Sequence, residues 1–266
     1  MINSMKDAFS VSGKNVFITG GHSGIGLGIS KAFAELGANV MMMGRRKEEG
    51  DTVALEIENE FGVKARFYAG DLTQDGDPAR VIGEAFNEFG SIDVLVNNSG
   101  LVRWFESINA DENNFADWHD VIELDMTATF VMSVLAAKRM RDTGGGVIIN
   151  ITSNAGEIVN TPQTTVSYSA SKAGVNHMTR MLAHEWAEYK IRVNAVAPGF
   201  TESKLGSAQD PETYAKLNDE WMKKTPTHRR NKPIEIAAAV VYLASPAAEQ
   251  VTGEIITVDG GYKLAN

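Results

Sequence analysis

Three polar residues in the middle of the sequence have the types and the spacing needed to reduce a ketone. Tyr168 and Lys172 are four positions apart, so on a helix they share a face and the ammonium group can lower the pKa of the phenol, which is normally about 10. Such a phenol can give its proton to the alkoxide that hydride transfer creates. Ser153, fifteen positions earlier, can hold the substrate oxygen beside the phenol. A surface Tyr–Lys pair and a helix-capping serine would explain each motif alone, but their order favours catalysis.

A glycine-rich turn near the N-terminus could bind the pyrophosphate of a dinucleotide. Gly20, Gly24 and Gly26 follow an apolar run and begin an amphipathic stretch. Glycine lets backbone amides approach a phosphate closely, and a helix N-terminus adds partial positive charge. The spacing differs from the standard dinucleotide fingerprint, and a simple tight turn is the alternative. The position between the first predicted strand and the first predicted helix favours cofactor binding.

The end of the second predicted strand indicates which nicotinamide cofactor binds. An acidic residue about 20 positions beyond the glycine turn would bind the ribose hydroxyls of NAD, but this chain has Arg45 and Arg46 there. A guanidinium group can bind the 2′-phosphate of NADP and no carboxylate is in place to repel it, so we expect NADP(H). The alternative is two solvated arginines at a helix start. Asp71 and Asn98 follow the next two predicted strands and are further candidates for cofactor contact.

An alternation of short apolar runs and amphipathic stretches must position these residues. Most of the runs are apolar throughout, which is typical of strands covered by helices on both faces. The predicted strands are Asn15–Thr19, Asn39–Met43, Ala65–Ala69, Ile92–Asn97, Gly146–Ile151, Arg192–Ala197 and Glu254–Val258, and the predicted helices are Gly24–Leu36, Glu49–Phe61, Pro78–Phe89, Trp118–Arg141, Ser167–Tyr189 and Pro233–Ala244. The pattern predicts an α/β fold, a single-domain Rossmann-type doubly wound parallel sheet with helices on both faces, over residues 1–266.

The segment 200–232 interrupts this alternation. It is polar, contains Pro211 and Pro226, and has one short helical pattern. A long insertion near the carboxyl ends of parallel strands is where a substrate lid would lie. A surface excursion with no role is the alternative.

Composition argues against several other classes of protein. The formal net charge is −9 and no dense basic run is present, so we expect no nucleic-acid partner. The chain has no cysteine, which excludes disulfides and thiolate chemistry, and its histidines lack metal-ligand spacing, so we expect no metal. No apolar run is long enough to cross a bilayer, and residues 1–14 lack the apolar core of a signal peptide. We therefore expect a cytoplasmic protein with no membrane contact.

Together these motifs resemble those of the short-chain dehydrogenase/reductase family, in its standard-length type, over nearly the whole chain. The matching pieces are Thr19-Gly20-x-x-x-Gly24-x-Gly26, Asp71, Asn97-Asn98-x-Gly100, Ser153, Tyr168-x-x-x-Lys172, Asn194-x-x-x-Pro198-Gly199 and Val258-Asp259-Gly260-Gly261. The resemblance implies that Ser153 binds the substrate oxygen and Tyr168 is the acid/base. It implies that Lys172 both lowers the pKa of the phenol and binds the nicotinamide ribose.

The resemblance also implies a wider cofactor site and an assembly. Pro198 and Gly199, with Thr201 or Ser203, are expected beside the nicotinamide carboxamide. The full set of expected cofactor-binding residues is Gly20, His22, Ser23, Gly24, Ile25, Gly26, Arg45, Arg46, Asp71, Leu72, Asn98, Gly100, Tyr168, Lys172, Pro198, Gly199 and Thr201. A homotetramer or homodimer is expected, joined through the predicted helices Trp118–Arg141 and Ser167–Tyr189.

Asp125 departs from the pattern of this family. The family usually has an asparagine there, which holds a proton-relay water near the lysine, although aspartate is seen in some members that resemble sugar-alcohol dehydrogenases. A carboxylate near Lys172 would favour its ammonium form and could still anchor the water. Asp125 is therefore a candidate catalytic residue with Ser153, Tyr168 and Lys172. The alternative is an aspartate that is hydrogen-bonded within a helix kink.

The sequence indicates the substrate only broadly. Hydrogen-bonding side chains such as Asn160 and Gln163 suit a sugar, polyol or keto acid, whereas Trp104 and Trp221 suit an apolar or cyclic ketone. The expected function is an NADP(H)-dependent oxidoreductase that interconverts a ketone and a secondary alcohol in such a small carbonyl compound. A 3-oxoacyl thioester reductase is the alternative, although no basic surface for a carrier protein is evident. A nucleotide-binding regulatory protein without catalysis is a further alternative, suggested only by Asp125.

Overall fold

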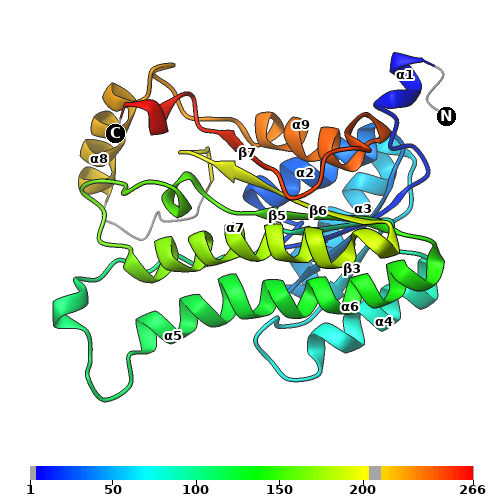
Figure 1. The fold of residues 1–266 in the computed structure, drawn as a ribbon, viewed down its shortest axis with the longest axis horizontal. Helices are drawn as coiled ribbons and strands as arrows, with labels where there is room; N and C mark the ends of the chain where they lie inside the picture. Colours follow the sequence, from blue (N-terminus) through cyan, green and yellow to red (C-terminus); the bar gives the residue numbers. More distant parts are fainter. Residues whose placement is uncertain (1–3, 204–210, 266) are drawn as a thin grey trace.

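The computed structural model describes residues 4–203 and 211–265. Within these ranges, seven strands form one parallel sheet between two layers of helices (Figure 1). The strands are β1 (Asn15–Thr19), β2 (Asn39–Gly44), β3 (Ala65–Ala69), β4 (Val94–Asn97), β5 (Gly146–Ile151), β6 (Ile191–Pro198) and β7 (Ile255–Val258). The helices are α1 (Met5–Ala8), α2 (Gly24–Glu35), α3 (Lys47–Phe61), α4 (Asp77–Phe89), α5 (Ala116–Ile122), α6 (Ala128–Thr143), α7 (Val166–Trp186), α8 (Pro211–Lys224) and α9 (Pro233–Ala244).

The strand order confirms the predicted doubly wound fold. The sheet runs β3-β2-β1-β4-β5-β6-β7, so the order reverses between β1 and β4. In open parallel sheets, ligands bind beyond the carboxyl ends of the strands at such a reversal. The residues that follow β1 and β4 therefore lie where a cofactor is expected.

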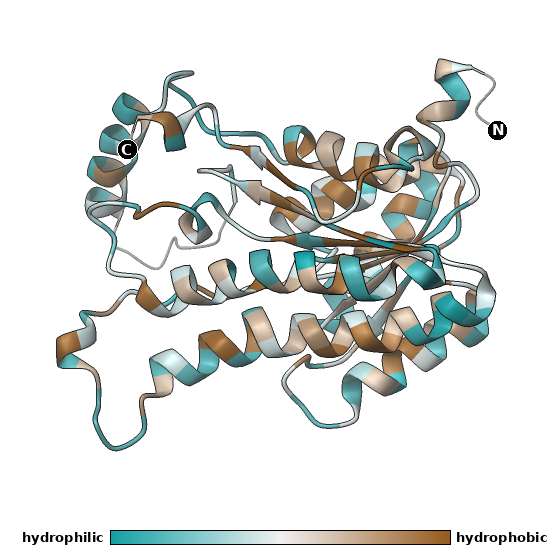
Figure 2. Cartoon of the chain, viewed as in Figure 1, coloured by the Kyte–Doolittle hydropathy of each residue, from teal (hydrophilic) through white to brown (hydrophobic). Residues whose placement is uncertain are grey.

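Each face of the sheet has its own apolar core. Neighbouring residues of a strand point to opposite faces, so Ile18 packs with the core that includes Phe33 of α2 and Val240 of α9, whereas Phe17 packs with the core that includes Met132 of α6. Helices α2, α3 and α9 cover the first face, and α4, α6 and α7 cover the second (Figure 1). Figure 2 shows the strands largely hydrophobic between helices of mixed hydropathy, which explains why the strand runs were recognisable from the sequence.

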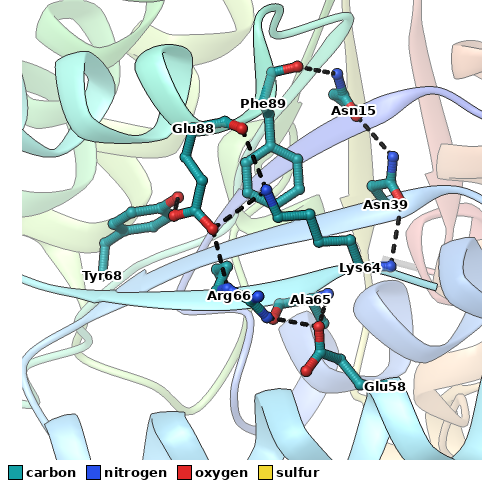
Figure 3. A network of polar contacts seen from close by, with 9 residues as sticks. All are labelled: Asn15, Asn39, Glu58, Lys64, Ala65, Arg66, Tyr68, Glu88 and Phe89. Carbon is teal, nitrogen blue, oxygen red and sulfur yellow. Dashed lines mark hydrogen bonds and ion pairs between the residues drawn. The ribbon is translucent and has the colours of Figure 1, made fainter. Parts of the chain in front are cut away.

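Polar contacts hold the sheet and its helices together at the amino ends of the first three strands, opposite the carboxyl ends (Figure 3). Asn39 of β2 donates a hydrogen bond to the Oδ1 of Asn15 at 2.9 Å, and accepts one from the backbone of Lys64 at 3.1 Å. Arg66 of β3 forms ion pairs with Glu58 of α3 and Glu88 of α4. These side chains join strands to helices and are already paired. We therefore expect the chemistry at the carboxyl ends of the strands.

The predicted helix Trp118–Arg141 is wrong as an uninterrupted α-helix. A π-helical segment, Glu123–Thr127, separates α5 from α6. A π turn holds one residue more than an α turn, so it changes the direction in which the following side chains point, and such turns are frequent at functional sites. Asp125 lies in the middle of this segment and its side chain is fully buried.

The segment 200–232 contains the helical pattern expected from the sequence, which forms α8. Trp221 of α8 is buried and stacks on Phe200, with ring centroids 4.3 Å apart and planes at 8°. This contact fixes α8 against the residues that follow β6. Part of the predicted lid, residues 204–210, lies outside the described residues, and so do residues 1–3 of the N-terminus.

Candidate active site

A cleft of about 1550 Å³ opens at the carboxyl ends of the strands. Its walls include almost all of the residues expected from the sequence: Gly20, His22, Ser23, Gly24, Ile25, Arg45, Arg46, Asp71, Leu72, Asn98, Gly100, Ser153, Tyr168, Lys172, Pro198, Gly199 and Thr201. Gly26 and Asp125 lie behind the walls and contact lining residues. The fold therefore brings the whole predicted set to one place.

Tyr168 and Lys172 are one turn apart near the start of α7. The Nζ atom of Lys172 lies 5.4 Å from the centre of the Tyr168 ring. The same Nζ is 3.2 Å from Oδ2 of Asp125 and donates to the carbonyl of Ile151, at the end of β5, at 3.3 Å. The lysine is thus held between α7, the end of β5 and the π-helical segment, with its side chain only 5% exposed.

The pKa of the Tyr168 phenol is raised, which differs from the lowering expected from the sequence. Burial raises it most; the Lys172 ammonium group lowers it, the Asp125 carboxylate raises it, and the hydrogen bond with Ser153 lowers it. The lysine therefore acts in the expected direction but does not outweigh burial. For Lys172 itself, burial lowers the pKa, and the Asp125 carboxylate and the phenol raise it by more, so the ammonium form is favoured.

Ser153 is placed by the turn that follows β5. Its backbone is extended, and its Oγ accepts a hydrogen bond from the backbone of Ala155 at 3.1 Å, which caps the short 3-10 helix Asn154–Gly156. The hydroxyl is also close enough to the Tyr168 phenol to lower its pKa. Ser153 therefore both caps the 3-10 helix and lies near the phenol, because the cap holds its hydroxyl at the place where α7 positions Tyr168.

Asp125 is anchored from two sides. Its Oδ1 accepts a hydrogen bond from the backbone of Leu101 at 2.7 Å, and its Oδ2 pairs with Lys172. A side chain at Gly100 would place its Cβ 3.4 Å from both Oδ2 of Asp125 and Nζ of Lys172, so the glycine keeps this space narrow but open. Burial raises the pKa of the Asp125 carboxyl, and the Lys172 cation and the Leu101 amide lower it.

The glycine turn packs tightly against the loop after β4. Gly20 has a φ of +66°, and a Cβ at Gly26 would lie 2.2 Å from the Gly20 carbonyl oxygen and 2.6 Å from Nδ2 of Asn98. Asn98 donates from Nδ2 to the carbonyl of Thr19, and the Thr19 hydroxyl accepts from the backbones of Asn98 and Ser99. The start of α2 therefore approaches the turn as closely as backbone contact allows, which leaves backbone atoms facing the cleft.

The arginines after β2 differ in their surroundings. Arg45 is exposed at the cleft. Arg46 lies with Nη2 3.1 Å from Nε2 of His22 and Nε 3.0 Å from a carboxylate oxygen of Glu49. Burial and then Arg46 lower the pKa of His22, so its neutral ring can accept from the guanidinium. Glu49 is a nearby carboxylate that the sequence interpretation did not consider.

The remaining predicted cofactor residues shape the two ends of the cleft. Asp71 accepts from the backbone and the hydroxyl of Thr73 at 3.0 and 2.8 Å, so it caps the turn after β3 and also lines the cleft. At the other end, Gly199 donates to the carbonyl of Val258 at 2.9 Å, and Thr201 donates to the carbonyl of Gly199 at 3.0 Å. These backbone contacts fix the wall that follows β6.

A buried polar network beneath the site was not identified from the sequence. Asn97 donates to Ser133 of α6 and to Asn150 of β5, and Asn150 donates to Thr179 of α7, each at 2.9 Å. The network links β4 and β5 to α6 and to α7, the helix that carries Lys172. Polar residues inside otherwise apolar runs were the signal that could have revealed it.

Comparison with known proteins assigns the chain to a family. A family model described as Enoyl-(Acyl carrier protein) reductase matches residues 20–263. A solved short-chain type dehydrogenase/reductase from Mycobacterium marinum is 35% identical, with a TM-score of 0.90 over 97% of this chain and 99% of that one. The chain belongs to the short-chain dehydrogenase/reductase family.

Relatives of this short-chain dehydrogenase/reductase include enzymes named for sugars and polyols. A galactitol 2-dehydrogenase (L-tagatose-forming) from Cereibacter sphaeroides is 38% identical over 97% of this chain and 98% of its own length. A sorbose reductase from Candida albicans is 34% identical over 98% of this chain and 90% of its own length. A gluconate 5-dehydrogenase from Burkholderia cenocepacia, solved in complex with NADP and tartrate, is 32% identical with a TM-score of 0.90, over 99% of this chain and all of that one (100%).

Two kinds of feature are absent from the described residues. No helix in the described part of the chain is both long and apolar enough to cross a membrane. No group of three or more histidine, aspartate or glutamate side chains in residues 4–203 and 211–265 is arranged to hold a metal ion.

Proposed function

We propose that this short-chain dehydrogenase/reductase uses NADP(H) to interconvert a ketone and a secondary alcohol on a small hydroxylated compound. The observation that carries the proposal is the position of Ser153, Tyr168 and Lys172 in one cleft whose far end presents Arg45 and Arg46. Acid/base groups and a phosphate-binding end in one continuous cleft suit a dinucleotide that lies along it with its nicotinamide beside the phenol.

The residues around the cleft fit NADP(H). The close packing of Gly20 and Gly26 leaves backbone at the cleft surface where side chains would obstruct a pyrophosphate. Arg45 and Arg46 would hold the 2′-phosphate, Asp71 the adenine amine, and Lys172 the nicotinamide ribose. Ser23, Ile25, Leu72, Asn98, Pro198, Gly199 and Thr201 line the path between those ends. When bound, NADPH supplies the hydride.

The protein's own residues then handle the oxygen and the proton. The Ser153 hydroxyl holds the substrate oxygen beside Tyr168, and the phenol gives its proton to that oxygen as the carbonyl carbon receives the hydride. The resulting phenolate is stabilised by the Lys172 cation, which Asp125 keeps in its ammonium form. Solvent returns the proton to the phenolate, and alcohol oxidation runs through the same steps in reverse.

The wall beside Ser153 suits a substrate with hydroxyl groups. Asn154 and Asn160 line the cleft and bond to one another at 3.2 Å, which leaves Nδ2 of Asn154 and Oδ1 of Asn160 without a partner among the described residues. Because the terminal torsion of asparagine is soft, these amide groups can reorient to meet a ligand in the cleft. A sugar, polyol or hydroxylated keto compound would satisfy them, as the names of the relatives also suggest.

We infer a single catalytic domain over residues 1–266, in which the segment 200–232 acts as a substrate lid. Phe200, Tyr214, Trp221 and Arg230 from this segment line the cleft.

We also propose a homotetramer or homodimer joined along α6 and α7, where Phe130 and Met181 leave 46% and 53% of their surface exposed. Sedimentation of Phe130→Glu would test this, since intact assembly would refute that interface. A cytoplasmic location is proposed from the sequence alone, and cell fractionation tests it.

The first experiment follows NADPH oxidation with sugars, keto acids, diketones, cyclic ketones and 3-oxoacyl thioesters. Turnover of a hydroxylated ketone that is lost in Tyr168→Phe supports the proposal. Turnover confined to thioesters would favour a 3-oxoacyl thioester reductase. Tight NADPH binding without turnover of any compound would favour a regulatory protein without catalysis.

A further inference from the structure

Arg230 lies on the cleft wall, at the end formed by the residues that follow β6. The next residue, Asn231, donates from its backbone to the carbonyl of Phe200 at 2.8 Å and accepts from the backbone of Glu202 at 2.9 Å. Its side chain donates to the carbonyl of Val258 at 2.7 Å. The backbone next to Arg230 is therefore tied to the strand ends that the proposed function places beside the nicotinamide, far along the cleft from Arg45.

The guanidinium group of Arg230 is oriented by neutral partners. Its Nε donates to Oδ1 of Asn218 and its Nη1 to the Tyr214 hydroxyl, each at 2.6 Å. The Cζ atom lies 5.0 Å from the centre of the Tyr214 ring and 6.0 Å from that of Trp221. Two hydrogen bonds and two aromatic contacts fix the group at the cleft wall without cancelling its charge.

The charge of Arg230 has no carboxylate partner in the described part of the chain. Its Nη2 has no hydrogen-bond partner there either, and the side chain is half-buried. The adjacent Arg229 differs, since both of its terminal nitrogens bond to Glu235. Arg103, elsewhere on the same cleft, lies between Asp117 and Asp120. A partly desolvated cation that is held in place but not neutralised favours binding an anion.

We propose that Arg230 binds a carboxylate of the substrate, so the enzyme acts on a hydroxylated keto acid or the matching hydroxy acid in preference to a neutral sugar. This inference rests on the proposed function. The free edge of the guanidinium offers Nη2 to one carboxylate oxygen. The Tyr214 hydroxyl accepts from Arg230, so its own hydrogen is available to the other oxygen. The Asn154–Asn160 pair then serves the hydroxyl groups of the same molecule.

The test compares a six-carbon polyhydroxylated keto acid with the matching neutral ketose and a ketose phosphate. Arg230→Gln removes the charge, Arg230→Lys keeps the charge without the planar fork, and Arg103→Gln is the matched control at a cation that is already paired. For the keto acid, Arg230→Gln should lower kcat/KM by about 10- to 100-fold, mostly through KM. Arg230→Lys should show a smaller loss of kcat/KM for the keto acid. For the ketose, kcat/KM of Arg230→Gln should change less than about twofold. Arg103→Gln should change kcat/KM for both substrates equally.

Separate outcomes identify which proposal fails. Equal use of the ketose and the keto acid, with equal loss in Arg230→Gln, would overturn the inference and leave the oxidoreductase intact. An Arg230-dependent preference for the ketose phosphate would overturn the carboxylate assignment. If no ketone is reduced, the proposed function fails, and calorimetric titration of the NADP-bound protein with the hydroxy acid still decides the role of Arg230. Binding that weakens in Arg230→Gln, with an unchanged melting temperature, supports it, and unaltered or absent binding refutes it.

Discussion

At the scale of single residues, the chemistry depends on the charge around one phenol. Tyr168 is buried enough that its pKa rises despite the cation beside it, and Asp125 adds to the rise. The phenol therefore keeps its proton to higher pH than a solvated tyrosine, which suits a group that must deliver a proton to an alkoxide. The carboxylate of Asp125 favours the ammonium form of Lys172 at the same time.

Replacing Asp125 by asparagine should shift the pH profile while most activity remains. Removal of the carboxylate lowers the pKa of both Tyr168 and Lys172, because the negative charge raises both. Ketone reduction needs the protonated phenol, so its alkaline limb should move to lower pH. Alcohol oxidation needs the phenolate, so its rising limb should move to lower pH as well. The measurement is kcat/KM against pH in both directions.

A matched variant controls for the loss of one negative charge. Asp120→Asn removes the same charge from an exposed position at the cleft, where solvent and salt screen it. It should leave both limbs in place. Limbs that do not move in Asp125→Asn would contradict an electrostatic role for Asp125 and leave only its hydrogen bond to Leu101.

Replacing Tyr168 by phenylalanine should lower kcat for ketone reduction by about 10²- to 10⁴-fold, the usual contribution of a general acid. The ring and its contact with Lys172 are retained, so NADPH should still bind in a fluorescence titration. Activity close to wild type would show that another group, such as Ser153, delivers the proton.

At the scale of elements, the glycine turn shows how closely α2 is built against the cleft. Gly26→Ala should lower the free energy of unfolding by about 1–3 kcal/mol, the typical cost of overpacking, because its Cβ would meet the carbonyl of Gly20 at 2.2 Å. NADPH binding should weaken as the turn is displaced. Denaturant unfolding without cofactor and NADPH titration measure the two effects.

A glycine in an open position provides the comparison. Gly83 lies within α4, and a Cβ there would meet nothing within 4 Å. Gly83→Ala should therefore raise the free energy of unfolding by about 0.5–1 kcal/mol through helix propensity. If Gly26→Ala were as stable as the wild type, the close contact between the turn and α2 would not constrain the fold.

The elements also show what the sequence could and could not reveal. The strands were predictable because helices cover both faces, so each strand is a nearly continuous apolar run; the fourth was predicted as Ile92–Asn97 and forms as Val94–Asn97. The π-helical segment was not predictable, because Asp125 meets Leu101 and Lys172 only through tertiary contacts. The neutral partners of Arg230 were not predictable for the same reason, because Asn218 and Tyr214 reach it only through the packing of α8.

At the scale of the whole molecule, arginines lie at both ends of one cleft in a chain with a net charge of −9. Arg45 and Arg46 lie at one end and Arg230 at the other. The preference for NADPH should therefore depend on salt, because the side chain of Arg46 is 60% exposed and Arg45 is also exposed.

Raising the ionic strength should weaken NADPH binding more than NADH binding, because only NADPH carries the 2′-phosphate and salt screens exposed charges. The dissociation constant for NADH divided by that for NADPH should fall toward one. The same fall is expected at low salt in the double variant Arg45→Gln/Arg46→Gln. Calorimetric titrations of both cofactors at several salt concentrations measure this ratio. Equal affinities for NADPH and NADH at low salt would refute the assignment of the arginines.

The placement of Tyr168 and Lys172 on one turn of α7 has a consequence for motion. The separation of their backbones cannot change without unwinding that helix, so one rigid helical unit carries the phenol and the ammonium group. Ser153 and Asp125 reach this unit from other segments, a capped 3-10 turn and a π-helical segment. We therefore expect a slow backbone opening that switches the chemistry off to occur in those segments or in the wall after β6. Amide hydrogen exchange should then be slower for the hydrogen-bonded amides from Ser169 to Lys172 of α7 than in the segments that complete the site.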